Sequence, residues 1–472
     1  MRQNTRLVSA LVLVAACNSD RSDRVHVTAQ LTDEASSRVL ALSHTLSEVA
    51  VAADATTLEP DLIIGGRDDG FGYVVDLAAT EDKLFVLDAV ANHIRGFNEA
   101  GSEIVRFGRE GRGPGEFRSP LAIAATDRHV IMWQSPASQA FAVWDHAGVL
   151  LSAAGATIDG DWDSSQWRRP RFHGLVDAPP EDLPNRLQVW GPDHFVQLLQ
   201  PDDGPFGRVH DRSSSDVPPA HLVRHDFDLD IVDTIAVVAG GRLEVVEEAV
   251  YERNTKKAGR IRLVQERLYT GRPVWTMGDG WIAISHGDST GMIVRHLDGS
   301  RMLEIRWPSN RPIVQEPDKR EAAKWMLAYQ AFMSTSSREL IEASSRRELK
   351  EGIRVTALEW TKFADQVPTI TAAFGAGECV FLAGFSPVDN RHGVALTWLA
   401  INVTRRTLEG VLRFEPATAM KFGRGGMIDR HGGAVRAFTT RHAYLVSVNG
   451  DGESFVERFR LPPSYNCGSE DD

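Results

Sequence analysis

One pentapeptide of the sequence has the spacing of a nucleophilic serine. Gly287, Ser289 and Gly291 stand in the pattern G-x-S-x-G, which in hydrolases exposes a serine on a sharp turn between a strand and a helix. The residues that follow here, MIVRHLDG, alternate like a second strand, so the helix that this chemistry requires is not predicted. We therefore expect Ser289 to lie in a hairpin turn, and we predict no catalytic residue from this motif.

Acidic and histidine side chains are the other candidates for chemistry, as ligands of a metal ion. Asp159, Asp161 and Asp163 alternate like the oxygen ligands of a calcium loop, but the glycine and the glutamate of such a loop are missing. His221 and His225 fall on one face of a predicted strand. No H-E-x-x-H and no paired C-x-x-C occurs, so local motifs predict no metal site and no cofactor. A divalent metal held by dispersed carboxylates stays open, with these contributors: Asp88, Glu116, Asp365 and Asp429.

The composition is that of an acidic, folded chain. The protein has 472 residues, a formal net charge of −12, 42% hydrophobic residues and 25% charged residues, which are values of ordinary globular proteins. A general nucleic-acid binder needs a basic face to displace phosphate counterions, whereas the arginines here are scattered. We therefore exclude nucleic acid as a partner.

The first residues have the pattern of an export signal. Arg2 and Arg6 form a short basic region, and residues 7–16 (LVSALVLVAA) form an apolar stretch too short to span a bilayer as a helix. The stretch ends in V-A-A-C, which resembles the bacterial lipobox, so residues 1–16 are predicted to be a lipoprotein signal peptide and Cys17 to carry the lipid. Residues 17–45 would be the lipidated cysteine and a flexible tether. We expect an exported protein, anchored by lipid to the cell envelope on its periplasmic or outer-membrane side; a plain secretory signal is the alternative.

Two further cysteines differ in their surroundings. Cys379 lies in the apolar run ECVFLAGF, whereas Cys467 lies in the polar tail PPSYNCGSEDD. An oxidising compartment would allow them to pair. Their different contexts favour two unrelated cysteines, and a disulfide is the alternative.

Short β-rich runs separated by turns fill residues 46–314 and 366–462. One pattern recurs in them: an apolar run, a polar turn, a second apolar run, with the turn written D/N-x-x-G, as in FNEAGSEIVRFG (97–108) and VWDHAGVLLSAAG (143–155). Repeated hairpins of this length are typical of propeller blades, and a two-sheet sandwich rarely exceeds about 250 residues. We predict an all-β propeller over residues 46–462 and a C-terminal tail over 463–472.

Two stretches interrupt the β pattern. Within residues 316–351, Trp325, Met326 and Tyr329 have helical spacing, and Ser336-x-x-Glu339 has the form of a capping box that begins a second helix. We predict an inserted helical hairpin there, docked on the β-structure as a lid or brace. Residues 157–186 are expected to form a long insertion loop.

A glycine-rich stretch carries a family resemblance. Residues 108–117 (GREGRGPGEF), followed by R-S-P, resemble the linker of bacterial NHL-like six-bladed β-propeller lipoproteins, a group that includes TolB-like and NHL-like propellers. Residues 86–97 (VLDAVANHIRGF) are similar to the NHL repeat core, and residues 187–270 match poorly. The resemblance implies six blades around a channel, with seven as the alternative. It implies no particular activity.

The propeller expectation also places candidate ligand-binding residues. The link from one blade to the next lies on the same face as the turn between the second and third strands of a blade. Asp88 and Asn92 should therefore share this upper face with Arg109, Arg112 and Glu116. The two arginines could bind an anionic ligand at the channel mouth, and pairing with acidic neighbours is the alternative.

Two function classes remain. The first is a lipid-anchored propeller of the cell envelope that acts as a binding or scaffold module, with a protein, peptide or glycan partner on its upper face. The second is a metal-dependent propeller hydrolase, lactonase or lyase with its site at the channel mouth. The first is favoured because the motifs supply no convincing nucleophile, acid–base pair or metal set.

Overall fold

The computed structural model describes the strand-bearing parts of the chain. Its described residues are 27–34, 37–49, 54–65, 70–72, 74–111, 113–117, 120–134, 140–155, 187–199, 220–238, 243–251, 259–266, 273–311, 313–316, 365–384, 396–417, 434–448, 454–465 and 467–468. Within these ranges α1 (Leu46–Val49) is a short helix, Glu316 is a single further helical residue, and no helix there is long and apolar enough to cross a membrane.

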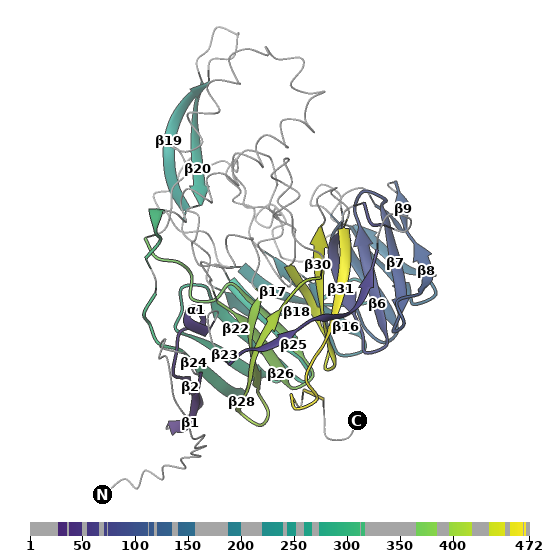
Figure 1. Ribbon diagram of the computed structural model, residues 1–472. Coiled ribbons are helices and arrows are strands. Elements are labelled where there is room, and N and C mark those ends of the chain that lie inside the picture. The colour runs from purple at the N-terminus through teal and green to yellow at the C-terminus, as the bar shows by residue number, and fades with distance from the viewer. Residues whose placement is uncertain are drawn as a thin grey trace, which may run out of the picture.

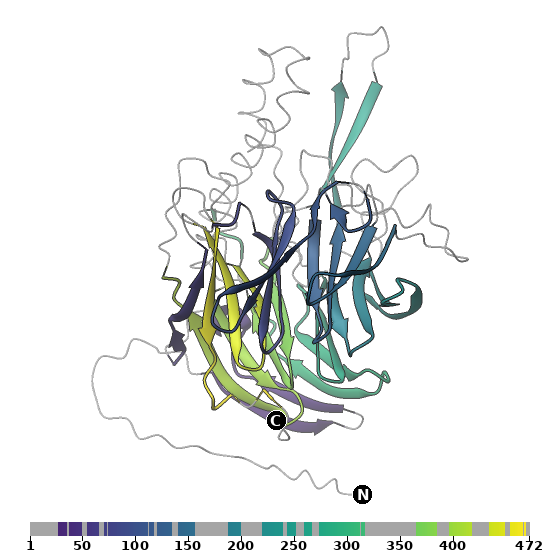
Figure 2. The same cartoon turned by 90° about the vertical axis from the view of Figure 1, so that its right-hand side faces the viewer.

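Six sheets form the blades of a propeller (Figures 1 and 2). Each blade contains four antiparallel strands that follow one another outwards from the ring axis. Blade one is β5 (Val74–Ala79), β6 (Lys83–Asp88), β7 (His93–Asn98) and β8 (Glu103–Phe107). Blade two is β11 (Pro120–Ala125), β12 (His129–Gln134), β13 (Ala140–Asp145) and β14 (Leu150–Gly155). Blade three is β15 (Leu187–Trp190), β16 (His194–Leu199), β17 (Ala220–Asp226) and β18 (Ile231–Val238).

The remaining three blades complete the ring. Blade four is β21 (Pro273–Gly278), β22 (Trp281–His286), β23 (Gly291–His296) and β24 (Arg301–Arg306). Blade five is β25 (Ala372–Ala376), β26 (Cys379–Ala383), β27 (Thr397–Asn402) and β28 (Thr407–Phe414). Blade six is β29 (Ala434–Phe438), β30 (His442–Val448), β31 (Ser454–Arg460) and β4 (Pro60–Ile64). The innermost strands contact one another in this order, and β29 contacts β5, so the prediction of six blades is confirmed and the seven-blade alternative is wrong.

An N-terminal strand closes the ring. β4 pairs antiparallel with β31, and Ile64 lies opposite Val456. The guanidinium of Arg458 donates to both carboxylate oxygens of Asp61, at 3.0 and 2.9 Å. Blade six is therefore built from strands near both ends of the described chain. Because β4 is followed directly by β5, this pairing ties blade one to the last strands of the chain.

The segment before β4 covers the outer edges of two more blades. β1 (Ala29–Glu34) pairs with β2 (Ser37–Leu42), and β2 runs parallel to β24 at the edge of blade four. β3 (Thr56–Leu58) runs parallel to β28 at the edge of blade five. The prediction of a flexible tether over residues 17–45 is therefore wrong for residues 29–34 and 37–42, which form paired strands, and the apolar side chains of β2 are buried against the neighbouring blades.

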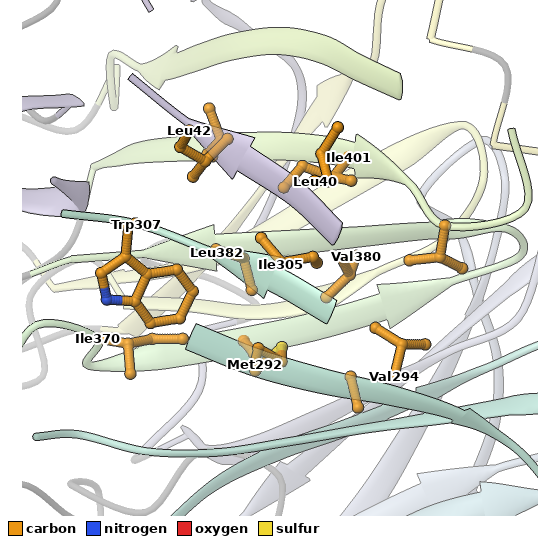
Figure 3. Packing of buried hydrophobic residues seen from close by; sticks show 14 of the residues in the cluster. Leu40, Leu42, Met292, Val294, Ile305, Trp307, Ile370, Val380, Leu382 and Ile401 are labelled. Atoms are coloured by element: carbon orange, nitrogen blue, oxygen red, sulfur yellow. The ribbon is translucent and has the colours of Figure 1, made fainter. Parts of the chain in front are cut away.

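Apolar side chains of adjacent blades pack face to face. Figure 3 shows this packing between blades four and five, where β2 adds its own side chains at the edge. Because strand residues alternate between the two faces of a sheet, each blade contributes one set of side chains to each neighbour. The residues labelled in Figure 3 illustrate the cluster: Leu40, Leu42, Met292, Val294, Ile305, Trp307, Ile370, Val380, Leu382 and Ile401.

The repeated turn motif has the predicted place. In blades one and two a D/N-x-x-G turn joins the third strand to the fourth, and in blade four the same place holds H-L-D-G, which begins at His296. The glycine of each turn has a positive φ: 78° at Gly101, 82° at Gly148 and 86° at Gly299. Only glycine adopts this conformation without strain. The predicted hairpins are confirmed.

The cysteine prediction is wrong. Cys379 and Cys467 form a disulfide between the first turn of blade five and the segment that follows β31, although 88 residues separate them. Both sulfur-bearing side chains are buried, and the backbone N–H of Glu378 donates to the carbonyl oxygen of Cys467 at 2.8 Å. Sequence context alone does not show that the C-terminal segment runs beneath blade five. A buried disulfide is consistent with a location outside the reducing cytosol.

The predicted insertions fall outside the described residues. This applies to the loop over residues 157–186 and to the helical hairpin over residues 316–351, apart from Glu316 at its start. Residues 187–270, which match the family poorly, contain all four strands of blade three and a further hairpin, β19 (Leu243–Tyr251) and β20 (Gly259–Glu266). This hairpin stands away from the ring in both views (Figures 1 and 2).

Candidate functional site on the upper face

The two faces of the ring differ in the length of their connections. Strand direction alternates within a blade, so the turn between its second and third strands and the link to the next blade lie at one end, the upper face. The other turns form the lower face, and each has two to four residues. The links that start at the upper end of one blade and end at the upper end of the next span residues 156–186, 239–272 and 307–371 of the sequence. Long connections on one face of a rigid scaffold are typical of a recognition surface.

Asp88 builds the upper turn of blade one. Its side chain is 1% exposed at the end of β6. One carboxylate oxygen accepts hydrogen bonds from the backbone N–H groups of Val90 and Ala91, at 3.0 and 3.1 Å, and the other accepts from Gly72 at 2.7 Å. The acid therefore fixes the turn and fastens the strand-to-strand link that precedes β5.

The same turn presents an apolar tip. Val90 is 68% exposed, and Asn92 has a φ of 52°, a left-handed conformation that asparagine tolerates. His93, opposite Asp88 in the register, has a pKa below its usual value because burial disfavours the charged ring, while Asp88 opposes this shift. Motif reasoning missed Val90, although a branched apolar residue in the turn A-V-A-N between two strands is visible in the sequence.

The glycine-rich linker forms a small loop held by its own side chains. Its short strands β9 (Arg109–Glu110) and β10 (Glu116–Phe117) pair in parallel. Arg109 donates from Nε to Glu116 Oε1 at 2.8 Å, and the second oxygen of Glu116 accepts from the N–H of Gly113 at 2.8 Å. The alternative that Arg109 pairs with an acidic neighbour is confirmed, yet its side chain is 79% exposed.

Phe117 fastens this loop to the ring. Its side chain is 0% exposed in the core between blades one and two, beside Phe107 and Trp144. Gly108, with a φ of 81°, lies so close to the ring that a Cβ there would meet a Phe117 carbon at 2.4 Å. The loop is therefore tied to the blades at its two ends and rises between them on the upper face, as predicted.

Several predicted residues lie outside the described part of the chain. These are Cys17, Arg112, Asp429 and the acidic triplet Asp159, Asp161 and Asp163. Asp365 is exposed, and its backbone carbonyl accepts from Val314 at 3.1 Å. Over the residues that the structure describes, no group of three or more His, Cys, Asp or Glu side chains could hold a metal ion.

Ser289 lies in a turn, as predicted. The turn joins β22 to β23, and the hydroxyl of Ser289 lies within 2.8 Å of the carbonyl oxygens of His286 and Gly291. The carbonyl of Ser289 itself accepts from the indole of Trp307 at 3.1 Å. These bonds hold the serine in the hairpin, and its hydroxyl faces the backbone of its own turn.

The two histidines of β17 share a face, as predicted, but they face another blade. His225 is buried and stacks on Phe195 with ring centroids 4.9 Å apart, and Phe141 of blade two lies 5.5 Å away. His221 lies four residues earlier on the strand, and burial lowers its pKa. Their shared face is therefore part of the packing between blades two and three.

Comparison with known proteins assigns no family and finds distant structural likenesses. No family model matches the chain, and no curated protein does. A member of the duf4221 family from Bacteroides vulgatus has 8% identity and a TM-score of 0.43, with 85% of this chain and 97% of that chain covered. A protein from Bacteroides fragilis has 9% identity and a TM-score of 0.35, with 86% and 98% covered. Virginiamycin B lyase from Staphylococcus aureus has 10% identity and a TM-score of 0.34, with 85% and 98% covered.

Proposed function

We propose that the protein is an exported, lipid-anchored β-propeller that binds a protein, peptide or glycan partner with its upper face. The observation that carries this proposal is the contrast between the faces. Short turns and the Cys379–Cys467 disulfide occupy the lower face, whereas every long connection leaves from the upper face. A scaffold that concentrates its long connections on one side is suited to recognition.

Blade one supplies a defined part of that surface. Asp88 and Glu116 hold the turn and the loop in shape through backbone hydrogen bonds, and Asn92 completes the turn. Val90 and Arg109 then offer an exposed apolar tip and an exposed guanidinium. Arg112, in the same loop of the sequence, would add a second positive charge. We propose that this combination contacts an acidic or polar partner.

Lipid anchoring would limit the distance between the propeller and the membrane. Val27 is already buried against the ring, so residues 18–26 are the only segment between the predicted lipid site and the folded body. An extended segment of this length spans about 30 Å. The proposed anchor therefore keeps the propeller close to the membrane surface.

Replacement of the predicted lipid site tests the anchor. We expect Cys17→Ser to move the protein from the detergent-extracted membrane fraction to the soluble fraction of the producing cells, because the acyl chains are lost. The control is Cys467→Ser, which removes the disulfide and leaves the N-terminus unchanged. Immunoblots of the two fractions measure the distribution. A Cys17→Ser protein that still requires detergent for release would contradict the proposed anchor.

A further inference from the structure

The innermost strand of blade six carries an extra residue. β29 has β30 on one side, and its other edge faces the ring axis. Val435 lies opposite Leu445, but Ala437 lies opposite Tyr444, so the register skips Arg436. A residue that is skipped in this way forms a β-bulge, which redirects its side chain.

The cores on the two sides of blade six show where the bulge sends this side chain. Val435 and Phe438 belong to the cluster between blades five and six, whereas Ala437 belongs to the cluster between blades six and one. In a regular strand Val435 and Ala437 would share a face. The alternation becomes regular once Arg436 is left out, so Arg436 belongs to neither core. The direction left to it is the inner edge of β29, toward the central channel.

Other polar side chains of the innermost strands are used to join blades. Asp76 of β5 accepts from the N–H of Ile123 in β11 at 3.0 Å. Gln188 of β15 accepts from the N–H of Met277 in β21 at 2.7 Å. Arg436 differs from both: its Nε is buried, and no acceptor for it occurs within the described part of the chain. The guanidinium of Arg436 stays charged, so leaving its buried Nε–H donor unmatched is costly.

The repeat of the fold identifies Arg436 as a departure from the pattern. Thr80, Thr126 and Thr439 make the same lower turn in blades one, two and six, where each hydroxyl accepts from the N–H three residues later. Leu77 and Ile123, three residues before their threonines, lie opposite Val86 and Met132, and the matching position of blade six, opposite Leu445, is filled by Val435. These three residues are apolar and buried, so Arg436 is a skipped residue beside this position and is not needed for its packing.

We propose that Arg436 is the binding residue of an anion site in the central channel, which takes a carboxylate or phosphate group of a small ligand. The guanidinium has five N–H donors in a planar fork, and this geometry matches two oxygens of one oxyanion. The channel site is distinct from the upper-face recognition surface. A test of the channel site therefore neither supports nor contradicts the proposed function, whichever result it gives.

Side-chain NMR of the full mature chain tests the site directly. The Nε–Hε cross-peak of Arg436 is assigned by its loss in Arg436→Gln, and the wild type is titrated with inorganic phosphate and, separately, with succinate. Sodium chloride keeps the ionic strength constant, which removes general salt effects. We expect a saturable shift of this cross-peak with at least one of the two anions, and the responding anion identifies the chemical group.

Three variants give the test its controls. Isothermal titration with the responding anion should show at least a tenfold higher Kd for Arg436→Gln and a smaller increase for Arg436→Lys, which keeps the charge and loses the fork. Arg460→Gln, at an exposed arginine of the same blade, should bind like the wild type. The absence of a saturable shift with both anions would overturn the proposal, as would a Kd in Arg436→Gln within twofold of the wild-type value.

Discussion

At the scale of single residues, the upper loop of blade one depends on one buried ring. The loop between β8 and β11 is rich in glycine, so its own chain has little tendency to hold one shape. Phe117 supplies the missing constraint, because its whole side chain is buried between two blades. The Arg109–Glu116 pair closes the loop above it but is exposed, and exposed pairs contribute little to stability.

Removal of this ring should destabilise the protein strongly. We expect Phe117→Ala to lower the free energy of unfolding by about 3–5 kcal/mol, since the substitution leaves a cavity in the core between blades one and two. Urea denaturation followed by fluorescence measures the change. Val149→Ala, at a largely exposed aliphatic side chain of blade two, should cost much less. Equal stabilities of Phe117→Ala and the wild type would show that the ring does not hold the loop.

Residue-level prediction worked where the cause is local. The D/N-x-x-G turns, the hairpin around Ser289 and the loop from Gly108 to Phe117 follow from short patterns, and the structure confirms them. The bulge at Arg436 is different, because it exists only relative to the partner strand β30. No local pattern states which residue a partner strand will skip, so the sequence did not single out Arg436.

At the scale of elements, blade six closes the ring, because it combines strands from the two ends of the described chain. Its outer strand comes from the N-terminal region, and Arg441 and Arg458 reach across to Glu81, Glu99 and Asp61. His442 lies beneath this network at the lower turn and is 5% exposed. Burial lowers its pKa below the usual 6.5, Arg458 and Arg441 act in the same direction, and Asp61 and Glu81 oppose them.

The sign of this shift predicts acid sensitivity. A histidine that stays neutral in the folded state takes up a proton on unfolding once the pH falls below about 6.5, so acid favours the unfolded chain. His93, His146 and His221 have pKa values lowered by burial and act in the same sense. We expect the free energy of unfolding to decrease from pH 7.5 to pH 5.5.

One substitution isolates the contribution of His442 to this pH dependence. Each histidine can contribute at most about 1.4 kcal/mol per pH unit, and His442→Gln should remove its share of the slope whatever its effect on absolute stability. His296→Gln, at an exposed lower turn of blade four, is the control. Urea denaturation at pH 7.5 and 5.5 measures both slopes. A slope in His442→Gln identical to that of the wild type would contradict this assignment.

Element-level prediction failed where pairing is long-range. The strands of the propeller were visible as apolar runs between turns, but β2 and β3 add in parallel to strands more than 200 residues later in the chain. Residues 29–42 are polar at several positions, so composition suggested a tether. The Cys379–Cys467 disulfide was missed for the same reason, since the path of the C-terminal segment beneath blade five is a property of the closed ring.

At the scale of the whole molecule, the two faces of the ring are built differently. Strand β4, the edge strands β2 and β3 and the disulfide close the ring and hold its rim and lower side. The upper face is left to carry the long connections and the β19–β20 hairpin (Figure 2). Recognition by the upper face is the central claim that follows from this architecture.

Photo-crosslinking from both faces of one blade tests this claim most directly. A benzophenone amino acid replaces Val90 at the upper turn of blade one or Ala100 at its lower turn, both exposed, in the cells that produce the protein. Irradiation followed by immunoblotting measures adducts of higher mass. We predict discrete adducts from position 90 and none from position 100. Adducts from position 100 alone, or equal adducts from both positions, would contradict recognition by the upper face.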